Sequence, residues 1–297
     1  MRRPPVARPL PAPAALPALA ALAVLLPAAG AAAQDVRWNF AEGDTHTYTF
    51  TLDADAEITQ FGQTSENSTD LTIVQKWTVK KVNGDGSAEV DRKIERVKIS
   101  SEAGETTTTY DSAAGDAVDP KTLPADFRVI AQLAGQTVQT VTAADGSVKE
   151  VTLPPAVLRA VEAAGPASNF KKEQVELLFT DRGYALPPAG AKEGDTYTEN
   201  AVVPLQFGNV DDVRTMTLKS LSDEAATIAL KTVMSAADGA AGGPMSVKSG
   251  ATEGTIDFDV AAGRLAKATA RQTIDLTGPG GFAIKLTSDS TFARTGD

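Results

Sequence analysis

The sequence predicts an α+β protein made mostly of strands, with curved antiparallel sheets from two related β units and helices packed on the concave face. Three observations predict this architecture. Apolar and polar residues alternate with period two in two separate regions. One long stretch with helical periodicity, Leu153 to Gly183, lies between these regions. Two short motifs also recur in the same order at nearly the same spacing.

Residues 1–33 predict a cleaved signal peptide. Arginines precede an apolar Ala/Leu run that ends in Ala31-Ala32-Ala33, as in secretory signals. An uncleaved anchor is the alternative, but Pro17 and Pro27 leave an apolar core shorter than the ~20 residues of a spanning helix. We therefore expect an exported product that begins at Gln34, is periplasmic or extracellular, and has no transmembrane segment once the signal is removed.

Charge and cysteine content narrow the possible partners. Signal removal takes away three arginines and no acidic residue, so the formal net charge changes from −10 to −13. This charge argues against nucleic acid and anionic membrane surfaces, which need clustered Lys and Arg. The chain has no cysteine, which excludes an acylated lipoprotein and any disulfide. A large core must therefore hold the fold.

The first β unit is predicted at residues 34–120. One face of its first strand carries aromatic and aliphatic residues, namely His46, Tyr48, Phe50 and Leu52. Asn83-Gly84-Asp85-Gly86 predicts a hairpin turn, because asparagine and glycine accept the positive φ that such a turn requires. The returning strand changes parity between Ile94 and Val97, which predicts a bulge near Glu95.

Residues 121–190 predict a helix-hairpin-helix connector. A short helix is expected at Ala125 to Leu133, followed by a hairpin that pairs Thr137 to Thr142 with Ser147 to Thr152. The stretch from Leu153 to Gly183 then predicts two amphipathic helices.

The first of these two helices begins at Pro154-Pro155 and ends at Gly165, which can take a left-handed conformation. The second runs from Ser168 to Gly183. Neither is long enough to be stable alone, so both need a surface to pack on.

The second β unit is predicted at residues 191–297. Its clearest strand places Phe282, Ile284 and Leu286 on one face. The Gly/Ala-rich segment Ala236 to Gly250 predicts a loop. Because no disordered linker separates the two units, we expect residues 34–297 to form one continuous body.

The two β units resemble copies of one another. Gly43-Asp44-Thr45-His46-Thr47 is matched by Gly194-Asp195-Thr196-Tyr197-Thr198. Tyr110-Asp111-Ser112-Ala113-Ala114-Gly115 is matched by Phe258-Asp259-Val260-Ala261-Ala262-Gly263. A duplication explains the shared order and spacing. The alternative is that both motifs are common turn sequences of β proteins.

Four segments carry a resemblance to a known family: Phe40-Ala41-Glu42-Gly43-Asp44, Gly135 to Val151, Leu186 to Asp195, and Gly254 to Leu265. In these segments the chain resembles an uncharacterised family of exported bacterial proteins, a domain of unknown function. The resemblance implies an exported β-rich fold and supplies no activity. The layout is also distantly similar to envelope lipoprotein carriers, in which a curved antiparallel sheet wraps around helices. That similarity concerns architecture only.

No catalytic or cofactor-binding motif is present in the sequence. His46 is the only histidine, and it occupies the slot of Tyr197 in the second unit, so a structural role is expected. The acidic pairs Asp53/Asp55, Asp211/Asp212 and Asp257/Asp259 are candidates for acid–base chemistry or calcium, but their pattern favours solvated strand faces and turns. Arg92, Lys93, Arg96 and Lys98 are expected on a solvated strand. We expect no enzyme, no cofactor and no metal.

One pattern points to a ligand cavity. Ala266, Ala268 and Ala270 are expected on one strand face, where small side chains leave volume on the concave side of a sheet. Val175, Leu178 and Phe179 of the second helix are the side chains expected to line or fill that volume. We expect these three side chains to fill the volume, because burying each of them stabilises the protein by about 1.5–3 kcal/mol.

Three functions remain open from the sequence. The first is a non-catalytic exported protein that binds an envelope protein or an apolar small molecule. The second is a structural or assembly module of the cell envelope without a ligand. The third is a carboxylate-based polysaccharide hydrolase, which is disfavoured because nothing in the sequence selects two acids over the others.

Overall fold

A computed structural model describes residues 35–114, 118–165, 171–180, 186–205, 208–237 and 245–296. Over these residues the chain is mostly strand. The strands are β1 (Thr45–Gln60), β2 (Gln63–Val82), β3 (Ala88–Ala103), β4 (Thr106–Asp111), β5 (Thr137–Thr142), β6 (Val148–Thr152), β7 (Thr196–Leu205), β8 (Gly208–Leu221), β9 (Ala225–Ala236), β10 (Ser246–Asp259), β11 (Arg264–Thr277) and β12 (Ala283–Gly296). The helices are α1 (Ala125–Ala131), α2 (Pro155–Ala164) and α3 (Lys172–Leu177), with 3₁₀ turns η1 (Pro120–Thr122) and η3 (Pro279–Gly281).

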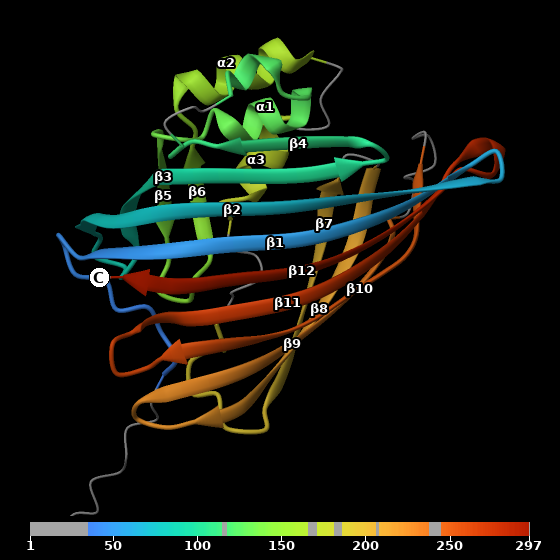
Figure 1. Cartoon of the computed structure of the whole chain (residues 1–297). Helices are drawn as coiled ribbons and strands as arrows, with labels where there is room; N and C mark the ends of the chain where they lie inside the picture. Colours follow the sequence, from blue (N-terminus) through green and yellow to red (C-terminus); the bar gives the residue numbers. More distant parts are fainter. Residues whose placement is uncertain are drawn as a thin grey trace, which may run out of the picture. The chain divides into compact units, whose positions relative to one another are not determined.

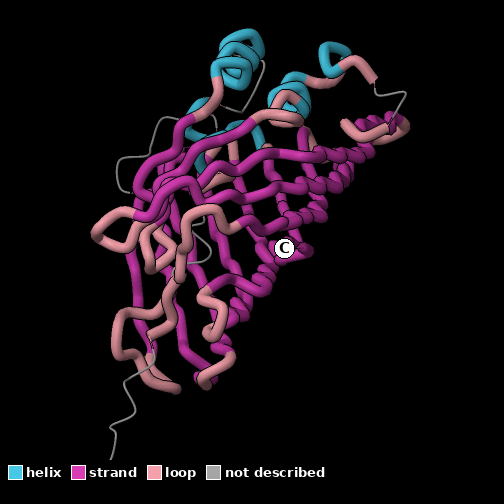
Figure 2. Tube along the Cα trace, turned by 90° about the vertical axis from the view of Figure 1, so that its left-hand side faces the viewer, coloured by secondary structure: helices cyan, strands magenta, loops and turns pink. Residues whose placement is uncertain are grey.

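The described strands form one antiparallel sheet of twelve strands in the order β6-β5-β3-β2-β1-β12-β11-β10-β9-β8-β7, with β4 paired to β3. The first strand of the first unit, β1, pairs with the last strand of the second, β12. Both predicted units therefore contribute to the same sheet. The sheet curves strongly, so that β7 and β8 lie behind β10 to β12 (Figure 1). The view turned by 90° shows the same curved wall of strands, with the helices gathered along one edge (Figure 2).

Local sequence signals correctly predicted several features of the first half. The turn after β2 contains Gly86 with φ 79°, and Gly86 donates to Asn83 over 3.0 Å. The bulge is confirmed at Glu95, because Val74 faces Arg96 whereas Gln75 faces Ile94.

The predicted connector elements are also found. The expected hairpin is β5–β6, α1 lies within the range expected for the short helix, and α2 ends at Gly165 with φ 54°. The predicted signal peptide, residues 1–33, lies outside the described residues, so it stays a prediction.

The second helix of the stretch Leu153 to Gly183 is shorter than predicted. Its expected ends, Ser168 and Gly183, lie outside the described residues, and α3 covers Lys172–Leu177. After α3 the backbone tightens, since Leu178 donates to Val175 and Phe179 donates to Glu176 over 3.1 and 2.9 Å. These bonds span three residues rather than four, which ends the α-helix and turns Phe179 toward the sheet.

A layer of helices over the concave face, as predicted, is not seen among the described residues, although α3 and the turn after it reach that side. α1 packs against α2 and β3, whereas α3 approaches β7. Figure 1 shows α1 and α2 beside the β3–β4 edge of the sheet. Helices of six to ten residues, such as α3 and α2, are too short to cover a sheet of this width.

The two units share a backbone arrangement where their first strands begin. Gly43 and Gly194 have φ of 89° and 91°. Gly43 donates to Val79 over 2.9 Å, and Gly194 donates to Leu218 over 2.8 Å. In each unit a register shift follows the acceptor residue directly, after Val79 and after Leu218. These shared features support the duplication proposed for residues 34–120 and 191–297.

An aromatic cluster closes the end of the sheet where β1 begins. The segment 35–40 runs along this end (Figure 1), and its Trp38 stacks on Trp77 with ring centroids 5.7 Å apart. Tyr48 of β1 stacks on Phe292 of β12 at 5.0 Å. Trp38 also donates its backbone N–H to Ala144 over 2.8 Å, which ties the segment to the β5–β6 turn. Apolar packing at this end therefore joins the first unit, the connector and the second unit.

Candidate functional site

The candidate site is a cavity of about 400 Å³ on the concave face of the sheet. Its walls come from β1, β2 and β7 to β12, and the end of α3 and the turn after it contribute Leu177, Leu178 and Phe179. Because the sheet curves, side chains of β2 such as Ile73 reach the same cavity as Val210 of β8. The volume lies within the range of about 300–1,000 Å³ that is usual for small-molecule pockets.

Apolar inward-facing residues line up in a row across six neighbouring strands, and four of them, Ile256, Ala268, Phe292 and Phe50, line the cavity. The row runs Leu218, Ile228, Ile256, Ala268, Phe292 and Phe50, from β8 to β12 and on to β1. Alternate residues of a strand face the same side, so a correct register places one apolar residue from each strand at the same level.

The neighbouring row has small residues at its centre. Leu230, Gly254, Ala270 and Ser290 face one another across β9, β10, β11 and β12. A Cβ atom at Gly254 would lie 2.3 Å from the carbonyl oxygen of Thr269, so the backbones approach too closely there for any side chain. Gly254 thus lets β10 and β11 lie close together, whereas the small side chains of Ala270 and Ser290 leave space in the cavity.

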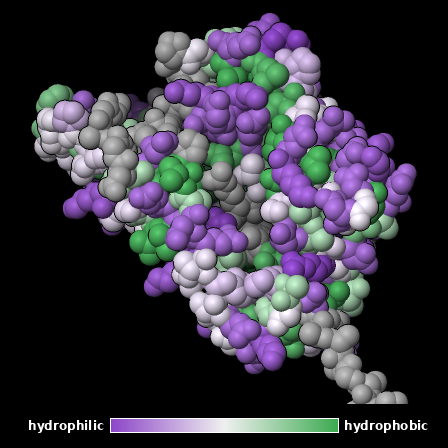
Figure 3. All heavy atoms as spheres, turned by 180° about the vertical axis from the view of Figure 1, so that it is seen from behind, coloured by the Kyte–Doolittle hydropathy of each residue, from purple (hydrophilic) through white to green (hydrophobic). Residues whose placement is uncertain are grey.

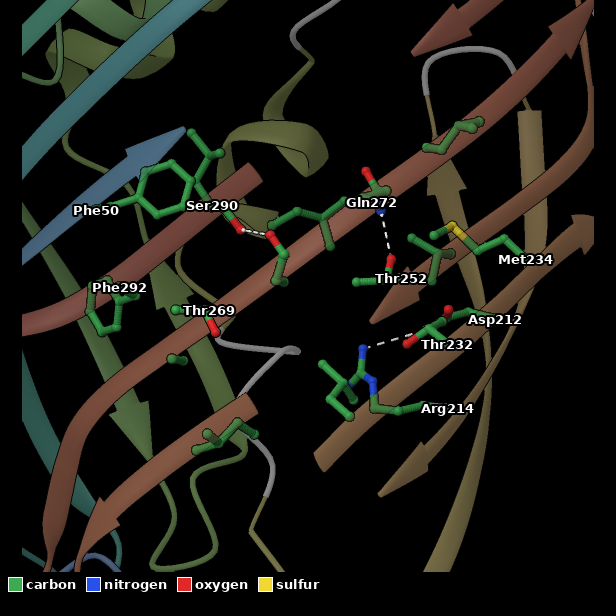
Figure 4. A pocket seen from close by; sticks show the side chains of 18 of the residues that line it. Phe50, Asp212, Arg214, Thr232, Met234, Thr252, Thr269, Gln272, Ser290 and Phe292 are labelled. Carbon is green, nitrogen blue, oxygen red and sulfur yellow. Dashed lines mark hydrogen bonds and ion pairs between the residues drawn. The ribbon is translucent and has the colours of Figure 1, made fainter. Parts of the chain in front are cut away.

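The next row is polar. Arg214, Thr232, Thr252, Gln272 and Ser288 face one another in sequence across β8, β9, β10, β11 and β12. Figure 4 shows the first four of these side chains around the cavity, with dashed lines from Gln272 to Thr252 and from Arg214 to Asp212. Gln272 Nε2 donates to Thr252 Oγ1 over 3.2 Å, and Arg214 Nη2 lies 3.4 Å from Asp212 Oδ2.

Sequence reasoning missed the polar row. A signal was present, since Thr232, Thr252 and Gln272 each occupy a position where the strand alternation expects an apolar side chain. The sequence does not show the row as a unit, because its five residues lie on five different strands and meet only through strand register.

Four of the six predicted lining residues meet at the cavity: Ala268, Ala270, Leu178 and Phe179. Ala266 does not. Asp257 faces Lys267 while Phe258 faces Leu265, so Ala266 is the extra residue of a bulge and leaves the face that Ala268 occupies.

Val175 also lies away from the cavity. It is fully buried in the core formed with Ile73 and Ile94, so it anchors α3 rather than lining the open volume. Leu178 and Phe179 therefore partly fill the concave side, and a cavity remains beside them.

The expectation of a solvated strand face was wrong for Asp212, which is buried and lines the cavity beside Arg214. The other acidic residues of the candidate pairs do not line the cavity. Asp53 and Asp55 are exposed, Asp257 accepts a hydrogen bond from Thr227 over 3.0 Å, and Asp259 lies 3.3 Å from Arg294. Among the described lining residues the charged side chains are Asp212 and Arg214.

No group of three or more His, Cys, Asp or Glu side chains that could hold a metal is found in the described part of the chain. Within the same residues, none of the helices combines the length and the apolar character that crossing a membrane requires.

His46 lies outside the cavity. Its Nδ1 atom is 3.0 Å from Arg264 Nη1, and Arg264 Nη2 is 3.9 Å from Asp44 Oδ2. In the matching position of the second unit, burial and the nearby Asp195 raise the pKa of Tyr197 to about 12. His46 and Tyr197 are each the second residue of the first strand of their unit, β1 and β7.

The prediction of a solvated strand was wrong for Arg92, which is fully buried. Its guanidinium lies 3.9 Å from the ring centroid of Trp77, and Nε donates to Thr140 Oγ1 over 3.1 Å. The reason is strand parity, since Val90, Arg92 and Ile94 all precede the bulge at Glu95 and face inward. This cation–π contact compensates part of the cost of burying the charge.

The surface seen from behind shows hydrophobic side chains in separate patches among hydrophilic ones (Figure 3). On the exterior, exposed Arg96 forms a bidentate ion pair with Asp111. Hydrogen bonds from Arg96 and from the backbone of Ala113 lower the pKa of Asp111 to about 2.

Comparison with known proteins assigns no family. No family model matches the chain. No curated protein matches it either.

Among solved structures, one on lipid–protein interactions in lipovitellin is 11% identical with a TM-score of 0.48, covering 87% of this chain and 26% of that chain. The chain thus spans about a quarter of that relative. An outer membrane channel from Pseudomonas putida F1 is 6% identical with a TM-score of 0.25, covering 87% and 97% of the two chains. A DUF1329 family protein from Desulfovibrio piger is 8% identical with a TM-score of 0.17, covering 82% and 85%. At these values the comparisons carry no argument about function, and the site must be interpreted from its own chemistry.

Proposed function

We propose that the protein is a non-catalytic exported protein that binds an apolar or amphiphilic small molecule in the concave-face cavity. The observation that supports this proposal is the cavity itself, about 400 Å³ beside Leu178 and Phe179. Ordinary protein cores contain few voids larger than a water molecule. A volume of this size, lined mostly by apolar side chains, is typical of a ligand site.

The small residues of the cavity wall support the same proposal. Ala270 and Ser290 face one another and line the cavity, where larger side chains would fill the space and bury additional apolar area. A protein with a purely structural role would gain stability from filling this volume. The open space is therefore more consistent with a ligand than with a structural module.

The test begins with native mass spectrometry of the full chain expressed in a host that exports it. We expect a bound small molecule that organic extraction removes, and a polypeptide mass that corresponds to a start at Gln34. A clean apo mass, with no binding of a lipid panel, would favour the structural-module alternative. A polypeptide that still carries residues 1–33 would contradict export through a cleaved signal.

A matched pair of variants tests whether the bound molecule occupies the cavity. Ala270→Leu adds volume inside the cavity, whereas Ala266→Leu makes the same change at the bulge of the same strand, outside the cavity. We expect Ala270→Leu to lose the bound molecule and Ala266→Leu to retain it, with both variants giving the circular dichroism spectrum of the original protein. Equal retention by a folded Ala270→Leu protein would put the ligand elsewhere.

A further inference from the structure

The polar row makes one level of the cavity wall hydrogen-bonding. Arg214, Thr232, Thr252, Gln272 and Ser288 occupy one level of five adjacent strands, and they face inward where core strands normally carry apolar residues. Three of them, Thr232, Thr252 and Ser288, are buried. Burying hydroxyl groups costs free energy unless they are hydrogen-bonded, so a continuous polar row on a concave face points to a function rather than to packing.

The rows on either side of the polar row are different. On one side stand Met234, Gly250 and Ile274, and on the other stand Gly254 and Ala270. Hydrogen-bonding side chains are therefore concentrated in this row, while the flanking rows are apolar or small except for Asp212, which faces Met234, and Ser290, which faces Ala270. This arrangement matches a ligand that has one polar end and one apolar end.

The described lining residues of the cavity carry one negative and one positive charge. Asp212 and Arg214 carry the charged groups among the described lining residues, and they are paired with each other at 3.4 Å. A ligand with a free carboxylate or phosphate would add a net negative charge to a partly buried site, which is costly. A neutral head group adds no such charge.

The row both donates and accepts hydrogen bonds. Threonine hydroxyls and the Gln272 amide can do both. Within the described part of the chain, the Gln272 side chain makes one hydrogen bond, to Thr252, so its carbonyl oxygen can still accept from a ligand. Hydroxyl and amide head groups, which also donate and accept, complement such a row.

We propose that the ligand is a single-chain amphiphile with a neutral hydroxyl- or amide-bearing head group. The head group binds Thr252, Gln272 and Arg214, and the chain lies along Ala270 and Ser290 toward Phe292. A volume of about 400 Å³ is near the lower end of the usual range for pockets, which suits one chain rather than several. This inference rests on the proposed function and adds the chemical class of the ligand.

Three probes of equal chain length test the inference: monododecanoylglycerol with a neutral diol head, dodecanoate with an anionic head, and methyl dodecanoate, which lacks a donor. Affinities are measured at pH 8 by displacement of a fluorescent acyl probe from the full chain. We expect monododecanoylglycerol to bind at least about tenfold more tightly than either of the other two.

Variants test whether the polar row causes the expected preference for monododecanoylglycerol. Thr252→Val combined with Gln272→Leu should reduce the affinity for monododecanoylglycerol about tenfold and leave that for methyl dodecanoate unchanged. Thr273→Val is the control, because Thr273 follows Gln272 on the same strand and is absent from the described cavity lining. Asp212→Asn should shift the preference toward dodecanoate, since it removes the negative charge 3.4 Å from Arg214.

The outcomes separate the two proposals. If all three probes bind equally and the double variant changes nothing, the cavity binds ligands but the head-group assignment is wrong. If dodecanoate binds most tightly, the charge argument is wrong. If none of the probes binds and no variant has an effect, the proposed function fails together with this inference.

Discussion

Phe179, in the turn after α3, tests how much this turn contributes to the stability of the core. Phe179 is 2% exposed, belongs to the same core as Val175 and Ile73, and also borders the cavity. Truncating a buried phenylalanine to alanine usually costs about 3–5 kcal/mol of unfolding free energy. Because Phe179 borders the cavity, it has fewer packing partners on that side, so we expect Phe179→Ala to cost about 3 kcal/mol, at the lower end of this range.

The assay is urea unfolding followed by far-ultraviolet circular dichroism and by tryptophan fluorescence. Phe61→Ala is the control, because the Phe61 side chain is 82% exposed at the tip of the β1–β2 hairpin. Its effect should stay within about 0.5 kcal/mol. A loss below about 1 kcal/mol for Phe179→Ala would refute the reasoning, because the turn after α3 would then be peripheral to the core.

Two further predictions concern the repeated glycines and the exterior ion pair. Gly43→Ala and Gly194→Ala should each cost about 1–2 kcal/mol, because a left-handed backbone strains any Cβ while nothing within 4 Å obstructs it. Gly84 has no positive φ, so Gly84→Ala should leave the unfolding free energy nearly unchanged in the same urea assay. If the losses of unfolding free energy for Gly43→Ala and Gly194→Ala differ by more than about 1 kcal/mol, the two glycines are not equivalent. The Asp111 carboxylate has a folded pKa of about 2 against an ordinary 3.8, so its stabilising effect is present above about pH 4 and lost as the pH falls through 2. Asp111→Asn should therefore flatten the fall of the melting temperature between pH 4 and 2, and a profile parallel to that of the original protein would contradict this.

The features predicted correctly from sequence are those set by neighbours along the chain. The turn ending at Gly86, the bulge at Glu95 and the β5–β6 hairpin depend on φ preferences and on alternation over a few residues. The helix α2 likewise follows from a proline start and the Gly165 end.

The errors have a different origin. The length of α3, the burial of Arg92 and the position of Ala266 each depend on what a distant segment contributes. α3 ends where Phe179 turns into the core, and Arg92 is buried beneath residues of β5. Ala266 leaves the cavity wall because one extra residue in β11 changes which side chains face inward.

A mostly β chain with helical connectors and strands of alternating polarity can be predicted from the residues alone, because those properties depend on local periodicity. Only the tertiary structure decided that β1 pairs with β12, that the sheet curves around a cavity, and that Arg214, Thr252 and Gln272 stand in one polar row. The physical reason is register. A shift of one residue reverses the face of every side chain in a strand, and register is chosen by the packing of the whole sheet rather than by any strand alone.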